Sequence, residues 1–541
     1  MKVLQTVMTL LLFIISAGVL AEPATVLDSV QDAVKSKIER QEIRAAVLGT
    51  QSGDKNRVTG YGQVSRSNEH IPAPSTLFEI GSITKVFTAI LAQQQVAAGR
   101  ADWDEPISQR IKGNFASAQV AAITWRELAS HTSGLPRMPD NMPMEDPLDP
   151  FGGYDRPLLE AFLMGYAPDS LDKSYEYSNL GAGLLGELAA QAAGLSYADA
   201  LERDVFKPLG LDDTQVAVSD AQAKQMATGF SQGADMPRWS SFDALAGAGA
   251  VVSSASDLLA FARLTLNPDQ AGAMADTLTA VLEPQGSGET GLGWHRKMSD
   301  AGTPLYWHNG GTGGFASVLV LNPESNETVV LLASSTDYGG VTNLAFTQMA
   351  GVSEVPESDL DLSIYEGAYE AAPGMVLTFF VNDGQLFGQA TGQGAFPLTS
   401  DSDHQFVFAP ADIAITFDEF KDNQAQRMTI VQAGNTTRAP RVAAEKGIQQ
   451  RKVIEVSSDA LAGLAGVYEL APGVTITVET RDGQLFAQLS GQSAFPVFPF
   501  AKDQFFYKVV DAELHFERQD DGDVKGVTLV QGGRQFAPRK K

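Results

Sequence analysis

The stretch FEIGSITKVFTAI, Phe78–Ile90, places a serine and a lysine at the start of a helical pattern. A helix would put Ser82 and Lys85, three residues apart, on one face. Apolar residues then recur at helical spacing, at Ile83, Val86, Phe87, Ile90 and Leu91. Free N–H groups at a helix start favour negative charge, and burial would lower the pKa of Lys85 toward that of a usable base. The stretch predicts a nucleophilic serine with a lysine beside it; the alternative is that Ser82 only caps the helix.

Three other serines have superficially similar motifs. Ser52 precedes Lys55 in a predicted hairpin turn, and Ser170 precedes Lys173 in a Pro-Asp-Ser loop, so neither has a helix behind it. Ser231 lies in a Gly-x-Ser-x-Gly sequence, but that motif needs a buried strand before it and a helix after it. The preceding AQAKQMAT has little β character. We therefore favour Ser82 over all three.

Strand patterns occur at both ends of the region around this helix. Residues 45–49 and 57–61 predict a hairpin, and residues 306–309, 315–321 and 328–333 predict three later strands. A helical, loop-rich stretch separates the two groups. This arrangement predicts one sheet that is closed by distant segments, with helices inserted between them.

Four further segments follow the Ser82 stretch in order. They are ITWRELASHTSGLP from residue 123, YEYSNLGAGLLG from residue 175, GLGW from residue 291 and WHNGGTGGFASVLV from residue 307. Together the five segments resemble the β-lactamase-related serine hydrolases: class C β-lactamases, D,D-carboxypeptidases, D-aminopeptidases and family VIII esterases. The resemblance covers about residues 30–350 and implies acyl transfer through an acyl-enzyme.

The resemblance implies a role for each motif residue. Ser82 would be the nucleophile, with Lys85 as its proton partner. Tyr177, in the only Tyr-x-Asn of the chain, would share a proton with Lys85, act as general base toward Ser82 and later protonate the leaving group. Asn179 would bind a substrate amide and hold Lys85. The backbone N–H groups of Ser82 and Gly311 would form the oxyanion hole.

The WHNGGTGGFASVLV segment has His308-Asn309-Gly310 at the place where classical β-lactamases have Lys-Thr-Gly. Gly310 and Gly311 leave room for a substrate backbone. A histidine is mostly neutral at pH 7, so His308 would bind a substrate carboxylate less firmly than a lysine does. The departure favours D-amino-acid peptides, amides or esters over efficient β-lactam hydrolysis. We interpret His131, in the HTSGLP segment, as structural.

Two segments near the C-terminus repeat each other with a constant offset of 99 residues, which aligns Tyr369 with Tyr468 and Asp383 with Asp482. Each has an Asp-Gly between β-rich runs, a strong hairpin signal. We expect two small antiparallel β domains, which resemble the lipocalin-like modules attached to some β-lactamase-related hydrolases. A structural or substrate-gating role is favoured for them.

The N-terminus predicts export. Lys2 is followed by an apolar stretch that ends in small residues at Ala21, the pattern of a secretory signal cut after Ala21. The alternative is a membrane anchor. We expect a periplasmic or secreted protein with no stable membrane anchor after cleavage.

The composition narrows the partners further. A net charge of -26 disfavours nucleic acid, and the absence of cysteine excludes disulfides and a thiol nucleophile. The six histidines form no His-Glu-x-x-His pair, so we expect no metal and no cofactor. The expected partner is a small-molecule or short peptide substrate, such as one derived from the cell wall.

The predicted fold class is α/β (α+β): a β-lactamase-like domain with a central antiparallel sheet and a helical subdomain, then two small antiparallel β domains. The expected divisions are a signal peptide at 1–21, a hydrolase domain at 22–353, and β repeats at 356–445 and 455–541. Two other functions stay open. The domain could acylate slowly as a penicillin-binding or sensing protein, or the repeats could carry a ligand-binding role.

Overall fold

The computed structural model describes most of the chain after residue 25, so the predicted signal segment lies outside the described residues. The described residues are 26–66, 68–143, 149–231, 234–239, 242–286, 288–299, 302–350, 362–372, 375–382, 385–391, 395–402, 404–408, 413–432, 435–444, 447, 453–454, 456–471, 474–481, 484–490, 494–507, 512–519, 523–531, 534–536 and 539–540. Among them, no helix combines the length and the apolar character needed to cross a membrane.

A six-stranded antiparallel sheet forms the centre of the first domain, in the order β2-β1-β10-β9-β8-β7. Its strands are β1 (Ala45–Ser52), β2 (Lys55–Gly62), β7 (His295–Met298), β8 (Pro304–Gly311), β9 (Ala316–Asn322) and β10 (Glu327–Ala333). The first hairpin joins the late strands through β1 and β10, where Ala46 faces Ala333. The predicted sheet closed by distant segments is therefore confirmed.

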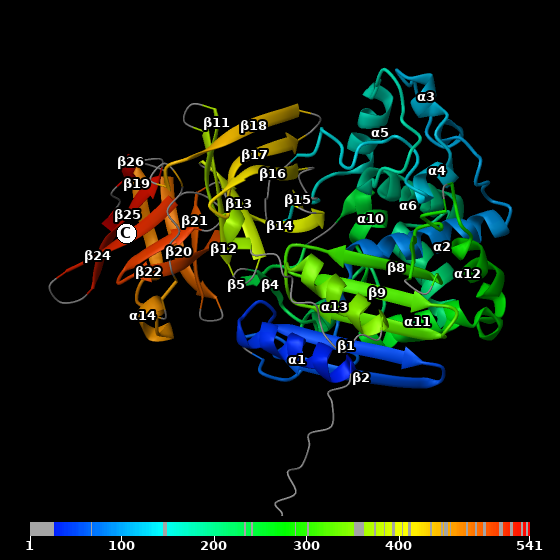
Figure 1. Cartoon of the computed structure of the whole chain (residues 1–541), viewed down its shortest axis with the longest axis horizontal. Coiled ribbons are helices and arrows are strands. Elements are labelled where there is room, and N and C mark those ends of the chain that lie inside the picture. The colour runs from blue at the N-terminus through cyan, green and yellow to red at the C-terminus, as the bar shows by residue number, and fades with distance from the viewer. Residues whose placement is uncertain are drawn as a thin grey trace, which may run out of the picture.

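Helices cover both faces of this sheet, because its central strands are apolar on both sides. Alternate residues of β1 point in opposite directions, so Ala45 and Val47 enter the larger core while Ala46 and Leu48 enter the smaller one. On the smaller side lie α1 (Val26–Glu39) and α13 (Tyr338–Ala350) (Figure 1). On the larger side lie α2 (Thr84–Ala97), α6 (Asn179–Ala193), α11 (Ala255–Leu266) and α12 (Ala275–Leu282).

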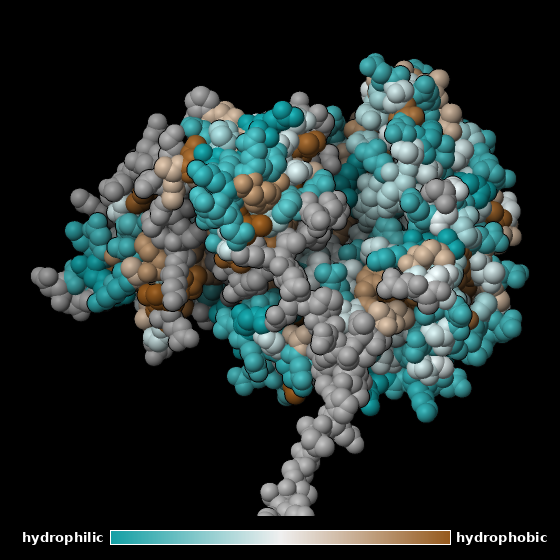
Figure 2. Space-filling view, viewed as in Figure 1, coloured by the Kyte–Doolittle hydropathy of each residue, from teal (hydrophilic) through white to brown (hydrophobic). Residues whose placement is uncertain are grey.

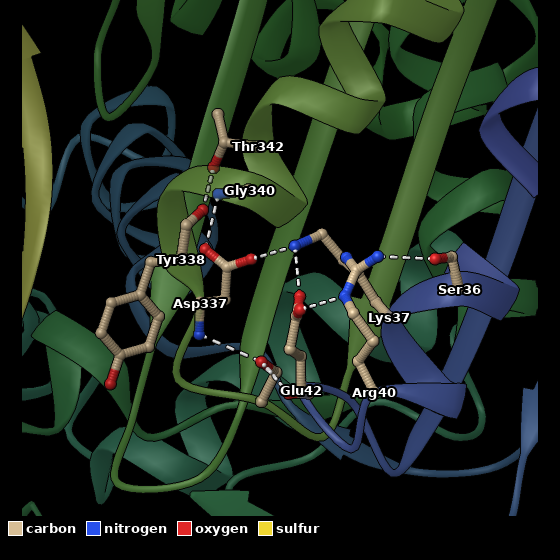
Figure 3. A network of polar contacts seen from close by, with 9 residues as sticks. Ser36, Lys37, Arg40, Glu42, Asp337, Tyr338, Gly340 and Thr342 are labelled. Atoms are coloured by element: carbon tan, nitrogen blue, oxygen red, sulfur yellow. Dashed lines mark hydrogen bonds and ion pairs between the residues drawn. The ribbon is translucent and has the colours of Figure 1, made fainter. Parts of the chain in front are cut away.

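A polar network joins α1 to the start of α13 (Figure 3). The ammonium of Lys37 donates to Glu42 and to Asp337, both at 2.7 Å. Burial opposes the charge of Lys37, but the two carboxylates raise its pKa above the ordinary value. Asp337 also accepts from the backbone N–H of Gly340 at 2.8 Å, which satisfies a free donor in the first turn of α13. The network thus fixes the end of the domain against its beginning.

The helical part between β2 and β7 is built around α2, which is buried on nearly all sides. A helix that is apolar all round lies inside a protein, and α6 and α12 enclose α2 here. Ser178 caps α6 by accepting from the N–H of Gly181, and Gly194 ends that helix in the left-handed conformation (φ +69). The surface of this part, at the upper right of Figure 2, is largely hydrophilic.

The remaining elements of this domain are short. They are β3 (Phe78–Glu79) paired with β6 (Val252–Ser253), β4 (Gly229–Ser231) paired with β5 (Ala234–Met236), α3 (Ala118–Ala121), α4 (Trp125–Ala129), α5 (Arg156–Gly165), α7 (Tyr197–Leu201), α8 (Lys207–Leu209), α9 (Asp220–Ala223) and α10 (Ala246–Gly249).

The first C-terminal repeat is a closed barrel of eight consecutive antiparallel strands, which removes the sheet edges. Its strands are β11 (Gly367–Ala372), β12 (Met375–Asn382), β13 (Gln385–Ala390), β14 (Ala395–Ser402), β15 (Gln405–Phe408), β16 (Ile413–Lys421), β17 (Gln424–Gln432) and β18 (Asn435–Val442). Pairing of Ala368 with Val442 closes the barrel. Figure 1 shows it between the first domain and the second repeat.

The second repeat follows α14 (Ser458–Ala462) and is a nine-stranded antiparallel sheet in which β24 also pairs with β25. Its strands are β19 (Gly466–Ala471), β20 (Val474–Arg481), β21 (Gln484–Leu489), β22 (Ala494–Ala501), β23 (Gln504–Tyr507), β24 (Ala512–Arg518), β25 (Val524–Gln531), β26 (Arg534–Phe536) and β27 (Arg539–Lys540). The aligned Tyr369 and Tyr468 are both fully buried, and each hydroxyl donates to the carbonyl four residues earlier, of Tyr365 and Leu464. The two repeats therefore share their internal packing as well as their sequence.

Candidate active site

Ser82 lies in a 3-10 turn, Gly81–Ile83, that leads directly into α2. The prediction placed Ser82 at the start of the α-helix, and the structure places it in the tighter turn just before. Gly81 has a φ of +46, and a Cβ on it would lie 2.7 Å from the backbone nitrogen of Gly311. Glycine is therefore required for β8 to come this close to Ser82.

Lys85 lies one turn into α2 and is 2% exposed. Its Nζ lies 2.9 Å from Oγ of Ser82, 2.8 Å from Oδ1 of Asn179 and 2.7 Å from the carbonyl oxygen of Ala248. Burial lowers the pKa of Lys85 well below 10.5, and the positive charge of Arg137 lowers it further. The amine is thus biased toward its neutral form.

These three contacts define the proton arrangement of a neutral Lys85. A neutral amine has two N–H donors and one lone pair, while the oxygens of Ala248 and Asn179 can only accept. The two N–H groups therefore go to those oxygens. The lone pair is left facing the hydroxyl of Ser82, which is the arrangement needed to remove its proton.

Tyr177 lies just before α6 and contacts both Ser82 and Lys85. Its ring centroid is 4.8 Å from Nζ of Lys85, and its hydroxyl is hydrogen-bonded to the side chain of Ser82. Burial raises the pKa of Tyr177 to about 12, although Arg137 and Ser82 act in the opposite direction. Tyr177 is thus a neutral phenol that can donate a proton.

The end of β8 packs directly against the residues before Ser82. A Cβ on Gly310 would lie 2.0 Å from the carbonyl oxygen of Ile80, and one on Gly311 would lie 2.7 Å from the ring of Tyr338. Neither position has room for a side chain. The backbone of Gly311 therefore runs beside that of Gly81 and Ser82, where the predicted oxyanion hole would be.

Three histidines, far apart in the sequence, gather around Tyr177. The ring of His131 lies 4.6 Å from that of Tyr177, and the ring of His295 lies 5.9 Å from it and 4.5 Å from the ring of His308. Burial lowers the pKa of all three, that of His295 to about 4. They are therefore neutral at pH 7.

The sequence interpretation treated His131 as structural and assigned nothing to His295. His131 does hold the backbone, since its Nδ1 accepts from the N–H of Ser178 at 3.2 Å. His131 is the first residue of the HTSGLP segment and His295 directly follows GLGW, so their places in or beside these segments were the available signal. Among the described residues, no group of three or more His, Cys, Asp or Glu side chains is arranged to hold a metal ion.

A buried carboxyl was also missed. Glu79, on β3, is 6% exposed and accepts from the backbone N–H of Trp239 at 3.0 Å. Burial raises its pKa to about 7. Glu79 borders a cavity of about 300 Å³ that Arg238, Trp239 and Phe242 also line.

The disfavoured serines lie in different surroundings. Ser52 faces Lys55 across the β1–β2 turn. The lysine near Ser170, Lys173, forms an ion pair of 3.0 Å with Glu127. Ser231 lies on the short strand β4, where its hydroxyl contacts that of Thr336 at 3.2 Å, and no helix follows it directly.

Comparison with known families agrees with this geometry. The model of the family described as Beta-lactamase matches residues 30–352, more than half of the chain. The chain belongs to the β-lactamase family. A second model, a domain of unknown function (DUF3471), matches residues 450–539, which cover the second repeat.

Relatives with several names match the same region. An unguisins hydrolase of Aspergillus campestris is 26% identical over 56% of this chain and 61% of its own length. Penicillin-binding protein 4 of Amycolatopsis lactamdurans is 29% identical over 55% of this chain and 86% of its own length. A beta-lactamase of Escherichia coli is 27% identical over 42% of this chain and 58% of its own length. The chain thus spans less than two thirds of two of these relatives.

A solved structure of a class C beta-lactamase in complex with cefoxitin has the same fold. It superposes with a TM-score of 0.53 at 22% identity and covers 60% of this chain and 99% of that one. The predicted fold class, a β-lactamase-like domain followed by antiparallel β structure, is confirmed.

Proposed function

We propose that this β-lactamase-family protein is an exported serine hydrolase that forms an acyl-enzyme at Ser82. The observation that carries the proposal is the contact between Lys85 and Ser82, in which two carbonyl-type oxygens take both N–H groups of a neutral amine and leave its lone pair for the serine. A serine that only capped a helix would need no such base.

Acylation follows from this arrangement. Lys85 takes the proton of Ser82 while the serine oxygen attacks the substrate carbonyl. The backbone N–H groups of Ser82 and Gly311 receive the developing negative charge on the carbonyl oxygen. The bond to the leaving group then breaks, and water later hydrolyses the ester on Ser82.

The leaving group needs a proton, and Tyr177 is the side chain suited to supply it. A phenol whose pKa is raised to about 12 keeps its proton at neutral pH and can recover one from Lys85. The sequence-based hypothesis gave Tyr177 the role of base toward Ser82. The proposal gives that first step to Lys85 and keeps Tyr177 as the later acid, because the pKa of Lys85 is lowered and that of Tyr177 is raised.

The proposed substrates are D-amino-acid peptides or amides, β-lactams and small esters. Asn179 would bind a substrate amide beside Lys85, and His308 and Gly310 on β8 are the other proposed substrate-binding residues. Export to the periplasm or medium is proposed from the pattern of residues 1–21.

Intact-mass spectrometry of the protein mixed with a penicillin tests the proposal. We expect an adduct on the wild type that is absent from a folded Ser82→Ala variant. The decay of the adduct reports hydrolysis of the acyl-enzyme, so a lifetime of about seconds indicates an enzyme and a lifetime of about hours indicates a penicillin-binding or sensing protein with little turnover. An adduct that persists on Ser82→Ala would refute the assignment of the nucleophile.

If no adduct forms with a penicillin, a D-aminoacyl amide and a short ester are the next substrates. Turnover of either by the wild type and its loss in Ser82→Ala would support the same mechanism. Failure of all three classes on folded protein would refute the proposed activity.

A further inference from the structure

Arg137 directly follows the HTSGLP segment, and its backbone is bonded to the start of the helix that carries Asn179. Its carbonyl oxygen accepts from the backbone N–H groups of Asn179, at 3.0 Å, and of Leu180, at 3.2 Å. Arg137 is therefore fixed to the first turn of α6, the helix that carries Asn179.

The guanidinium of Arg137 has no counter-ion in the part of the chain that the structure describes. Its Cζ lies 4.9 Å from the ring centroid of Tyr177, and its Nε is buried without a hydrogen-bond partner. No ion pair joins it to a described carboxylate, although acidic residues outnumber basic ones by 65 to 39 in the whole chain. Arg137 is partly buried, and a guanidinium whose Nε is buried without a partner is a group that an anion can satisfy.

Arg137 is also the permanent positive charge beside Tyr177. Burial lowers the pKa of Lys85, His295 and His308, so these groups are biased toward neutrality. A guanidinium keeps its charge at every physiological pH. Arg137 is therefore the positive charge that would attract an anionic group of a substrate.

His308 is unsuited to the same task. Its Nδ1 lies 2.6 Å from the carbonyl oxygen of Asn309, which assigns the ring proton to Nδ1. Its Nε2 is then an acceptor, and that nitrogen is buried without a partner. An acceptor repels a carboxylate and would instead receive an N–H or O–H of the substrate.

We propose that Arg137 binds the carboxylate of substrates whose leaving group carries one, in place of the lysine that Lys-Thr-Gly enzymes have on the β8 strand. The inference rests on the proposed function, because Tyr177 protonates the leaving group and Arg137 lies against the ring of Tyr177. The substrate class is a peptide with a free C-terminal carboxylate. A planar guanidinium can hold such a group through two parallel hydrogen bonds.

An equilibrium binding experiment tests this without turnover. In a Ser82→Ala background, the dissociation constants of N-acetyl-D-alanyl-D-alanine and of its C-terminal carboxamide are measured by calorimetry. We expect the acid to bind roughly tenfold more tightly than the carboxamide, the effect of one charge-assisted contact. Arg137→Gln should remove this preference by weakening the acid alone.

Two further variants separate charge from structure. Arg137→Lys keeps the charge and should keep part of the preference, while Arg203→Gln removes a cation that already pairs with Asp204 and should change nothing. A preference that survives Arg137→Gln would overturn the inference. Equal weakening of both ligands by Arg137→Gln, or no binding of either ligand to the Ser82→Ala protein, would overturn it too.

The two proposals can fail separately. If the wild type forms no acyl-enzyme with any substrate class but the Arg137-dependent preference is present, the catalytic proposal fails and the binding role stands. If acylation occurs and the preference is absent, Ser82 keeps its role and Arg137 loses its own.

Discussion

The hydroxyl of Ser317, on β9, donates a 2.8 Å hydrogen bond to the carbonyl oxygen of Ile80, two residues before Ser82. Both groups are buried. Ser317 faces Gly310 across the β8–β9 pair, and a Cβ on Gly310 would lie 2.0 Å from the Ile80 carbonyl oxygen and 2.6 Å from the Ser317 hydroxyl. This bond joins the central sheet to Ile80, the residue that leads into the turn carrying Ser82. The bond therefore helps to hold the residues before Ser82 against the strands that carry Gly311.

Ser317→Ala should raise the activation free energy of the reaction by more than it lowers the free energy of unfolding. The Ile80 carbonyl keeps its hydrogen bond from the backbone N–H of Ile83, so loss of the Ser317 bond should cost only about 1 kcal/mol of stability. A small displacement of the Ser82 N–H, in contrast, costs roughly tenfold to a hundredfold in rate. Steady-state kinetics and denaturant unfolding measure the two effects. Ser325→Ala, at an exposed serine of the β9–β10 turn, is the control. Undiminished kcat in Ser317→Ala would show that the contact does not position the site.

Gly310→Ala should have a larger effect. The added Cβ would lie 2.0 Å from the Ile80 carbonyl oxygen, a distance that backbone atoms cannot accept without moving. We expect β8 to shift away from Ser82 and kcat/KM to fall roughly a hundredfold or more. The matched control is Gly165→Ala, where no atom lies within 4 Å of the new Cβ. If Gly310→Ala acylates as fast as the wild type, the proposed oxyanion hole is misplaced.

Local patterns in the sequence were enough to predict the helix after Ser82 and the first hairpin. The apolar stripe after Ser82 marks a real buried helix, and the alternation in 45–49 and 57–61 marks the β1–β2 hairpin. Each signal is made by residues that lie close together in the sequence, so neither depends on how the chain folds back. The order of the five motifs added the pairing of Lys85 with Asn179, 94 residues away.

The rest of the site depends on contacts that no local pattern encodes. His295 stands on an edge strand, and its place against Tyr177 and His308 is set by the pairing of β7 with β8. Glu79 resembles any acidic residue in the sequence, and its raised pKa comes from burial beside Trp239, 160 residues later. Burial of this kind follows from tertiary packing alone.

The pH dependence of acylation should report Lys85. The base must be neutral to accept the proton of Ser82, so the rate should rise with pH as Lys85 loses its proton. Because burial lowers the pKa of Lys85, this rise should be complete well below pH 10.5. Lys85→Met should lose roughly a thousandfold in acylation rate and the rising limb with it. A limb that persists in Lys85→Met would belong to another group.

Glu79 gives a prediction about stability whose sign can be worked out. Its pKa is about 7 in the folded protein and near 4.5 when unfolded, so the folded state holds the proton more tightly. The stabilisation is complete below pH 4.5 and is lost as pH rises through 7. Glu79→Gln stays uncharged and can still accept from Trp239, so its stability should not fall over this range. Between pH 5 and pH 8 the stability of the variant should rise relative to that of the wild type by up to about 3 kcal/mol.

All five tryptophans lie in the first domain, so denaturant unfolding followed by tryptophan fluorescence reports on that domain alone. Glu324→Gln, exposed in the β9–β10 turn, controls for the change in net charge. If the two variants show the same pH profile relative to the wild type, Glu79 does not titrate near neutrality, and the cavity beside it must admit enough water to keep the carboxylate charged.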